Sequence, residues 1–204
     1  MKVLIACEYS GIVRDAFIAL GHEAMSCDLL DTERPGPHYK GDVRDVLYDG
    51  WDMVIAFPPC TYLSNAGACR LYPEKGKIDK ARYLQGLQAK EFFLMFYNFD
   101  CPKIAIENPV SSGVYKMPQH TQEIQPWMFG HPYTKKTRLW LKGLPELKAT
   151  NSVNPIGPFV PSGTGRKDRS KYGSAKRGDD AKNRSKTFQG IADAMAAQWV
   201  GING

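Results

Sequence analysis

The sequence has no apolar segment long enough to cross a membrane and no cysteine arrangement typical of a disulfide framework. Its amino terminus, MKVLIACEYSG, contains only a short apolar run from Val3 to Cys7. A membrane span needs about 20 apolar residues, and a secretion signal also needs a longer run. The five cysteines are odd in number and include no CxxC pair, which argues against disulfides and a zinc site. We therefore predict a soluble, cytoplasmic protein that binds neither a metal nor a membrane.

The chain also lacks internal repeats and heptads, and its 204 residues suit one hydrophobic core. We expect a single domain over residues 1–204.

Residues 163–186 hold nine Lys or Arg and three Asp, so this stretch alone carries a net charge equal to the +6 of the whole chain. It is rich in Gly and Ser and has no apolar periodicity, which predicts a flexible basic loop that contacts nucleic-acid phosphates. A merely solvated loop is the alternative. The candidate nucleic-acid contacts are Arg166, Lys167, Arg169, Lys171, Lys176 and Arg177.

Short apolar runs alternate with helical patterns along most of the chain. Strands are predicted at residues 2–7, 22–28, 53–57, 102–108 and 137–143. Helices are predicted at residues 11–21, 80–99 and 187–200. Residues 32–41 and 109–136 are rich in Pro and Gly and are expected to be irregular. This alternation predicts an α/β fold with a mostly parallel sheet covered by helices on both faces.

The predicted strands end in polar or reactive groups, and ligands of such sheets bind where the strands end. The first strand runs into CEYSG, the second ends at Asp28, and the next two run into FPPC and IENP. Cys60 and Glu107 are therefore expected to face one pocket, although Cys60 could instead be a buried structural thiol. Gly11 and Asp28 have the spacing of a nucleotide site, in which a tight turn precedes an acid that holds a ribose.

These motifs occur in an order that resembles the cytosine C5 DNA methyltransferases, which use S-adenosylmethionine. The resemblance rests on the glycine loop, the acid after the second strand, GDVRD, PPC with SNAG, IEN, TRLWL and FQGIADAM. It covers most of residues 1–145 and 187–200, and short phage and prophage proteins of this family are the closest likeness. FPPC lacks the polar first residue and aromatic last residue of the amino-methylating enzymes, which favours chemistry at a ring carbon.

The resemblance implies a Rossmann-like methyltransferase fold and methylation of cytosine at carbon 5 in DNA. Cys60 would add to carbon 6, because carbon 5 becomes nucleophilic only after such an addition. Glu107 would hydrogen-bond ring nitrogen 3 and stabilise the developing charge. Asn108 would position the loop.

The QxRxR element of the family can be aligned in two ways. An alignment on FGHP makes Lys135 and Thr137 the counterparts of its arginines, whereas an alignment on TRLWL selects Lys136 and Arg138. We prefer Arg138 as the residue that contacts the base, since a strand should fix the register. An ordinary surface cation at a strand edge is the alternative role for Arg138.

The resemblance also implies a set of cofactor contacts. Asp28 would hold the ribose hydroxyls of S-adenosylmethionine, and Asp42 in GDVRD would hold the adenine amine. The complete set is Glu8, Tyr9, Ser10, Gly11, Asp28, Leu29, Asp42, Val43 and Pro58. The first loop departs from the FxGxG pattern of the family, because CEYSGIV retains only Gly11 of the expected glycines.

The interval between TRLWL and FQGIADAM is too short for the separate target-recognition domain of highly specific family members. A basic insertion at about 151–186 takes its place, so we expect DNA binding with low sequence specificity. Two other functions are open at this point. The chain could be a non-catalytic protein that binds nucleic acid with a methyltransferase fold, or an enzyme that modifies a free pyrimidine nucleotide.

Overall fold

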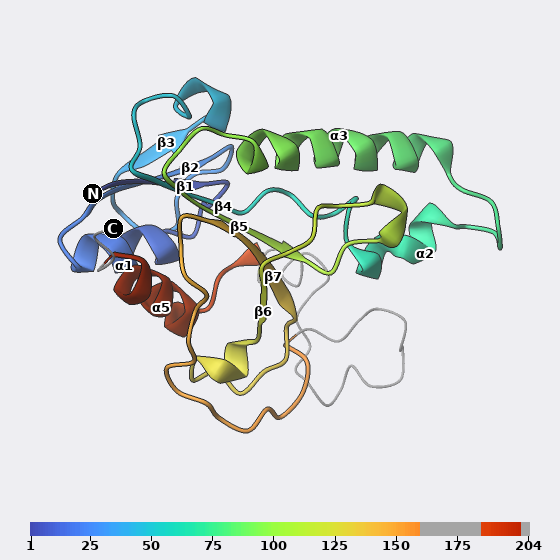
Figure 1. Cartoon of the computed structure of the whole chain (residues 1–204). Helices are drawn as coiled ribbons and strands as arrows, with labels where there is room; N and C mark the ends of the chain where they lie inside the picture. Colours follow the sequence, from blue (N-terminus) through green and yellow to red (C-terminus); the bar gives the residue numbers. More distant parts are fainter. Residues whose placement is uncertain (160–184, 201–204) are drawn as a thin grey trace.

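Seven strands form one mixed sheet in the order β3-β2-β1-β4-β5-β7-β6 (Figure 1). The computed structural model describes residues 1–159 and 185–200. Five strands run parallel to one another: β1 (Lys2–Ala6), β2 (Glu23–Asp28), β3 (His38–Lys40), β4 (Met53–Ala56) and β5 (Lys103–Pro109). β7 (Thr137–Lys142) lies between β5 and β6 (Gln122–Ile124) and runs antiparallel to both. The predicted α/β class with a mostly parallel sheet is confirmed.

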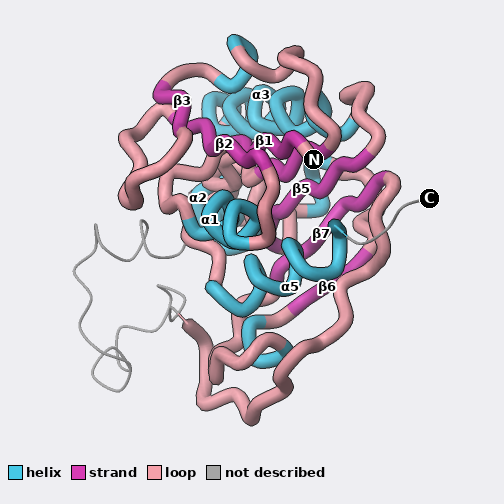
Figure 2. The backbone as a smooth tube through the Cα atoms, turned by 90° about the vertical axis from the view of Figure 1, so that its left-hand side faces the viewer, coloured by secondary structure: helices cyan, strands magenta, loops and turns pink. Residues whose placement is uncertain are grey.

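Helices cover both faces of this sheet, as the sequence predicted. On one face α1 (Ile12–Ala19) lies beside α5 (Gln189–Val200), and on the other face lies α3 (Lys80–Tyr97), as Figures 1 and 2 show. The shorter helical segments are α2 (Ala68–Leu71), η1 (Val43–Asp45), η2 (Asn65–Gly67), η3 (Gly113–Tyr115) and η4 (Pro126–Met128).

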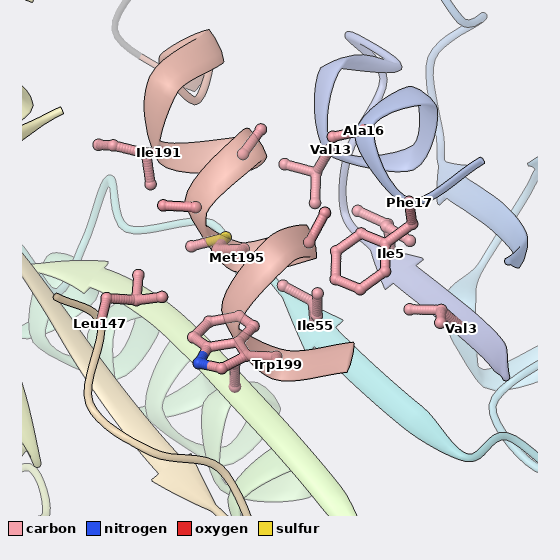
Figure 3. Close-up of a cluster of buried hydrophobic side chains, with 14 of the residues drawn as sticks. Val3, Ile5, Val13, Ala16, Phe17, Ile55, Leu147, Ile191, Met195 and Trp199 are labelled. Carbon is pink, nitrogen blue, oxygen red and sulfur yellow. The ribbon is translucent and has the colours of Figure 1, made fainter. Parts of the chain in front are cut away.

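Alternate residues of the strands supply the two hydrophobic layers, because successive side chains of a strand point to opposite faces. Val3 and Ile5 of β1 pack with α1 and α5, where Phe17 and Trp199 are completely buried (Figure 3). On the other face, Leu4 of β1 belongs to the cluster that contains the aromatic side chains of α3. The sheet is therefore buried on both sides, which holds its strand ends rigidly in place.

The sequence did not reveal β3 and β6, which lie in stretches expected to be irregular. Each has only three residues, too few for an alternating pattern to stand out from neighbouring prolines and glycines. Pairing with a neighbour produces them: His38 is aligned with Ser26 of β2, and Ile124 with Thr137 of β7. Tertiary contacts rather than local preference therefore form these edge strands.

A completely buried arginine attaches α1 to the connection between β2 and β3. The Arg14 guanidinium donates hydrogen bonds of 3.0 to 3.2 Å to Ser26 Oγ, Thr32 Oγ1 and the carbonyls of Arg34 and Pro35. Its Nε donates to Asp15 Oδ1 at 2.9 Å. A buried charge is tolerated when its donors are paired in this way. Arg14 therefore fixes the position of residues 32–35, which lie near the carboxyl ends of the strands.

Replacement of Gly190 by alanine is expected to lower the free energy of unfolding by about 1–3 kcal/mol, the usual cost of overpacking. An added Cβ would lie 2.0 Å from the Phe129 carbonyl oxygen, so the backbone of α5 or of Phe129 must move. Urea denaturation would measure the effect. Gly113→Ala is the matched control, because no atom lies within 4 Å of its Cβ position. Equal stability of the two variants would contradict this account.

Candidate functional site at the strand ends

The strand register brings four chain segments to one edge of the sheet. Ala6 at the end of β1 is aligned with Ala56 at the end of β4, and Ala56 with Ile106 in β5. On the other side of β1, Ala6 is aligned with Cys27, which precedes Asp28. CEYSG, FPPC, IENP and the end of β2 therefore leave the sheet at the same edge.

The strand order reverses at β1, because β2 and β3 extend the sheet in one direction and β4 and β5 in the other. In open α/β sheets, ligands bind in the crevice outside the strand ends at such a reversal. CEYSG after β1 and FPPC after β4 border this position. Most of the residues expected to bind a cofactor or react with a substrate therefore lie around the place where the fold favours a ligand.

The side chain of Asn108 connects the segment after β5 to the segment after β4. Asn108 is completely buried, and its Nδ2 donates to the Pro58 carbonyl at 3.3 Å. Its Oδ1 is buried and has no hydrogen-bond partner within the described ranges. An unpaired buried acceptor is costly, so this residue is better explained by a task in the site than by packing. The expected role of Asn108 in positioning the FPPC loop agrees with this contact.

Backbone hydrogen bonds connect the same two segments beyond the sheet. The Asn65 amide donates to the Val110 carbonyl and the Ser112 amide to the Leu63 carbonyl, both at 2.8 Å. The Cys60 carbonyl accepts from the Leu63 amide at 3.1 Å and from the Ser64 amide at 2.9 Å. Cys60 thus begins a hydrogen-bonded turn whose end is fixed to the segment after Glu107.

Cys60 is half-buried, whereas Cys27 and Cys101 are buried. Burial and the nearby charge of Asp28 raise the pKa values of Cys7 and Cys27, and the pKa of Cys27 reaches about 12. Burial also raises the pKa of Cys101. Because a thiol reacts as the thiolate, these three cysteines are poor nucleophiles at neutral pH. Of these four cysteines, Cys60 is the one whose thiol the site can present to a substrate.

Glu107 lies in β5 on the face that α5 covers. Burial raises the pKa of its carboxyl group, and the nearby charge of Lys135 opposes that shift. The group faces a cavity of about 10 Å³, lined by Glu107, Lys135, Thr137, Thr187, Phe188, Ile191 and Met195. A cavity of this volume holds about one water molecule. Glu107 is thus a carboxyl group that keeps its proton to higher pH than usual, as a hydrogen-bond donor to a ring nitrogen requires.

The strand register bears on the choice between the two alignments of the QxRxR element, which select either Lys135 and Thr137 or Lys136 and Arg138. Arg138 is aligned with Asn108, and Leu139 with Glu107, so Arg138 lies on the opposite face of the sheet from Glu107. Arg138 Nε lies 3.6 Å from Glu123 Oε2, and Lys136 Nζ lies 3.3 Å from the same oxygen. Lys135 and Thr137 line the Glu107 cavity instead. The alignment on FGHP is therefore the one that the geometry supports.

A carboxylate takes over part of the structural role of the missing glycines in CEYSG. Glu8 is 5% exposed, and its Oε1 accepts hydrogen bonds from the Ser10 hydroxyl and, at 2.9 Å, from the Ile12 amide at the start of α1. Gly11 has a φ of 73°, in the left-handed region that favours glycine. Glu8 Oε2 is buried with no hydrogen-bond partner in the part of the chain that the structure describes, and burial raises the pKa of the group.

The other residues expected to bind the cofactor differ in how much of each side chain remains available to a ligand. Asp28 Oδ1 accepts from the Leu30 amide at 2.9 Å, and Leu29 is 72% exposed. Asp42 caps η1, and hydrogen bonds from Arg44 lower its pKa to about 2. The side chain of Val43 is buried in the core, which leaves its backbone for the expected contact with the cofactor.

Tyr9 is almost completely buried, at 8% exposure, and connects CEYSG to two distant segments. Its hydroxyl lies 3.1 Å from Ser185 Oγ, and its carbonyl accepts from the Glu33 amide at 2.8 Å. Lys186 Nζ lies 2.7 Å from Glu33 Oε2. Sequence reasoning missed Glu33 and Lys186, because nothing in their local sequence indicates that residues so distant along the chain meet at this edge.

The six cations expected to contact nucleic acid lie outside the described residues: Arg166, Lys167, Arg169, Lys171, Lys176 and Arg177. The residues on either side of this gap are described and lie together. The ring centroids of Phe159 and Phe188 are 4.6 Å apart, and Phe188 lines the Glu107 cavity. The chain therefore leaves and re-enters the described structure beside Glu107.

Searches against models of known families and against curated proteins found no match to this chain. Within residues 1–159 and 185–200, no helix combines the length and apolar character that a bilayer span requires. The same part of the chain contains no group of three or more His, Cys, Asp or Glu residues that could hold a metal ion.

Proposed function

We propose that this protein methylates cytosine at carbon 5 in DNA, with S-adenosylmethionine as the methyl donor and Cys60 as the nucleophile. The observation that carries the proposal is the connection through Asn108, which holds the Cys60 turn beside a strand that presents a desolvated carboxyl group. Addition to carbon 6 and protonation of nitrogen 3 require a thiol and a proton donor at neighbouring positions. The resemblance to the cytosine C5 DNA methyltransferases assigns the same two residues to these tasks.

Cys60 Sγ forms a bond to carbon 6, and the displaced electron pair moves through the ring toward nitrogen 3. Glu107 donates a proton or a hydrogen bond there, which makes carbon 5 nucleophilic. Lys135 lines the same cavity, and its charge limits the rise in the Glu107 pKa. When bound, S-adenosylmethionine supplies an electrophilic methyl group. Loss of the carbon 5 proton to a water molecule and return of the nitrogen 3 proton to Glu107 then allow the thiolate to leave and restore the aromatic ring.

The residues at the reversal of strand order fit a cofactor with an ammonium group and a ribose. Glu8 Oε2 is a buried acceptor with no hydrogen-bond partner within the described ranges, and such an atom is best satisfied by a donor from a ligand. Asp28 stands at the end of β2, where an acid can accept hydrogen bonds from ribose hydroxyls. Asp42 would bind the adenine amine only while also holding Arg44.

The proposal is tested by incubating the protein with S-adenosylmethionine labelled in the methyl group and separate pools of duplex DNA, single-stranded DNA, RNA and dCMP. Label should enter DNA, and chromatography of the hydrolysed product should identify 5-methylcytosine. Label only in dCMP would favour modification of a free nucleotide. No label in any pool, together with intact DNA binding, would favour a non-catalytic nucleic-acid-binding protein.

Replacement of Arg166, Lys167, Arg169 and Lys171 by serine should weaken binding to DNA of different sequences by similar factors. Each cation that neutralises a phosphate releases counterions, so the slope of log affinity against log salt should fall by roughly one for each such cation that is replaced. Fluorescence anisotropy at several salt concentrations measures this slope. The control replaces Lys103 and Lys142 by serine. These lysines lie at the opposite ends of the strands, where β5 begins and β7 ends. An unchanged slope in the first variant would show that residues 163–186 are only a solvated surface.

A further inference from the structure

Beside the Glu107 cavity lies a group of four rings, His131, Tyr133, Phe159 and Phe188, here called the aromatic cluster. Ring centroids are 4.6 Å apart for Phe159 and Phe188, 5.0 Å for His131 and Phe188, and 5.3 Å for Tyr133 and Phe159. Tyr133 and Phe188 are stacked at 6.2 Å with an interplanar angle of 30°. The rings come from segments of the chain that are distant in sequence, so the fold assembles the aromatic cluster.

The aromatic cluster lies at the margin of the hydrophobic core rather than within it. All four residues are only partly buried, and only Phe188 packs against a core cluster. The Tyr133 hydroxyl makes no hydrogen bond within the described residues and is not enclosed. Partly exposed aromatic rings with a polar tip are typical of surfaces that bind a partner, whereas a structural role alone would favour complete burial.

Cations and the reaction site lie next to these rings. Lys135 Nζ lies 6.0 Å from the Phe188 ring centroid and donates to the Lys186 carbonyl at 3.4 Å. Phe188 lines the cavity that contains Glu107. In sequence, Phe159 and Phe188 stand on either side of the stretch that carries nine cations. Aromatic rings beside positive charge are the combination with which proteins bind unpaired nucleotides.

We propose that the aromatic cluster stacks on an unpaired base of DNA next to the cytosine that enters the site. This inference rests on the proposed function for the identity of the target nucleotide. A cytosine can reach Cys60 and Glu107 only when it leaves the duplex or is already unpaired, which exposes the faces of adjacent bases. Every base has such a face, so stacking by Tyr133 and Phe159 adds affinity without requiring a particular sequence. The site should therefore prefer single-stranded DNA or distorted duplex DNA to regular duplex DNA.

The test uses a short single-stranded DNA with 2-aminopurine, whose fluorescence is quenched by stacking, beside one cytosine. Wild-type protein and Tyr133→Phe should quench the probe and bind it with similar affinity. The double variant Tyr133→Leu, Phe159→Leu keeps apolar side chains but removes two rings, so quenching should disappear and affinity should fall about tenfold or more. Tyr48→Leu is the control, because Tyr48 is 76% exposed and stands in the segment before β4, away from the strand ends.

Thermal unfolding of each variant separates a loss of stacking from a loss of structure. If the double variant does not unfold cooperatively, Tyr133→Leu alone is compared with Tyr133→Phe, and only the leucine variant should lose affinity. Equal quenching and affinity in a folded ring-deficient variant and the wild type would overturn the inference, even if the protein methylates DNA. Ring-dependent quenching without methyl transfer under any condition would instead support the aromatic cluster and contradict the proposed enzymatic function.

Discussion

Replacement of Cys60 by serine is expected to reduce methyl transfer to cytosine by about a thousandfold or more, because the hydroxyl cannot replace the thiolate in the attack on carbon 6. Single-turnover assays with labelled cofactor measure this change. The fold should persist, because the backbone carbonyl of Cys60 and the contacts of Asn108 hold the Cys60 turn. Binding of DNA should remain close to that of the wild type.

Cys101→Ser is the matched control for this substitution. Cys101 lies just before the start of β5, whereas Cys60 lies beyond the end of β4, so the two thiols are at opposite ends of the strands. The Cys101 thiol donates to the Trp51 carbonyl at 3.4 Å. A serine hydroxyl can make the same hydrogen bond, so activity should remain. DNA that contains 5-fluorocytosine should form a denaturation-resistant adduct with the wild type and with Cys101→Ser, but not with Cys60→Ser. An active Cys60→Ser enzyme would refute the assignment of the nucleophile.

Replacement of Glu107 by glutamine is expected to slow the chemical step by about 100-fold or more, the usual range for loss of a general acid. Substrate affinity should change little, because the charge that Glu107 stabilises appears only during the attack. In the wild type, the acid form persists above the usual pH range, since burial raises the Glu107 pKa. The single-turnover rate should therefore fall as pH rises through that pKa, and this decrease should be absent in the variant.

Stability provides an independent check on Glu107. A folded-state pKa above the unfolded value means that its contribution is complete below the unfolded pKa and is lost as pH rises through the folded pKa. Glu107→Gln should therefore be at least as stable as the wild type above the folded-state pKa of Glu107, and any stability advantage of the variant should disappear below the unfolded-state pKa. Urea denaturation across this range tests the expectation. Weaker substrate binding with an unchanged single-turnover rate would make Glu107 a binding residue instead.

Much of the architecture was predictable because long apolar runs were separated by helical patterns. β1, β4 and β5 are buried on both faces, so their sequences are almost continuously apolar. The short edge strands β3 and β6 were not predictable, since pairing with longer neighbours creates them. Local sequence therefore determines the centre of the sheet, while its edges depend on contacts that appear only after folding.

The site could be predicted in outline but not in the orientation of its side chains. Cys60, Glu107 and Asp28 were predicted because they lie at or just beyond the ends of strands that stop at one edge of the sheet. The choice between Arg138 and Thr137 could not be made from the sequence, because a displacement of one residue in a strand moves a side chain to the other face. The role of Glu8 was also hidden, since a carboxylate that caps α1 is indistinguishable in sequence from a surface acid.

The proximity of Phe159 and Phe188 has a consequence for how this protein can change over evolution. The ring centroids of Phe159 and Phe188 lie 4.6 Å apart, so the chain between these two residues closes a loop at one place on the described structure. The entropic cost of such a loop rises only with the logarithm of its length, by about 0.6 kcal/mol for each doubling. A longer or shorter connection at this point would therefore cost little free energy and would leave the residues at the strand ends in place.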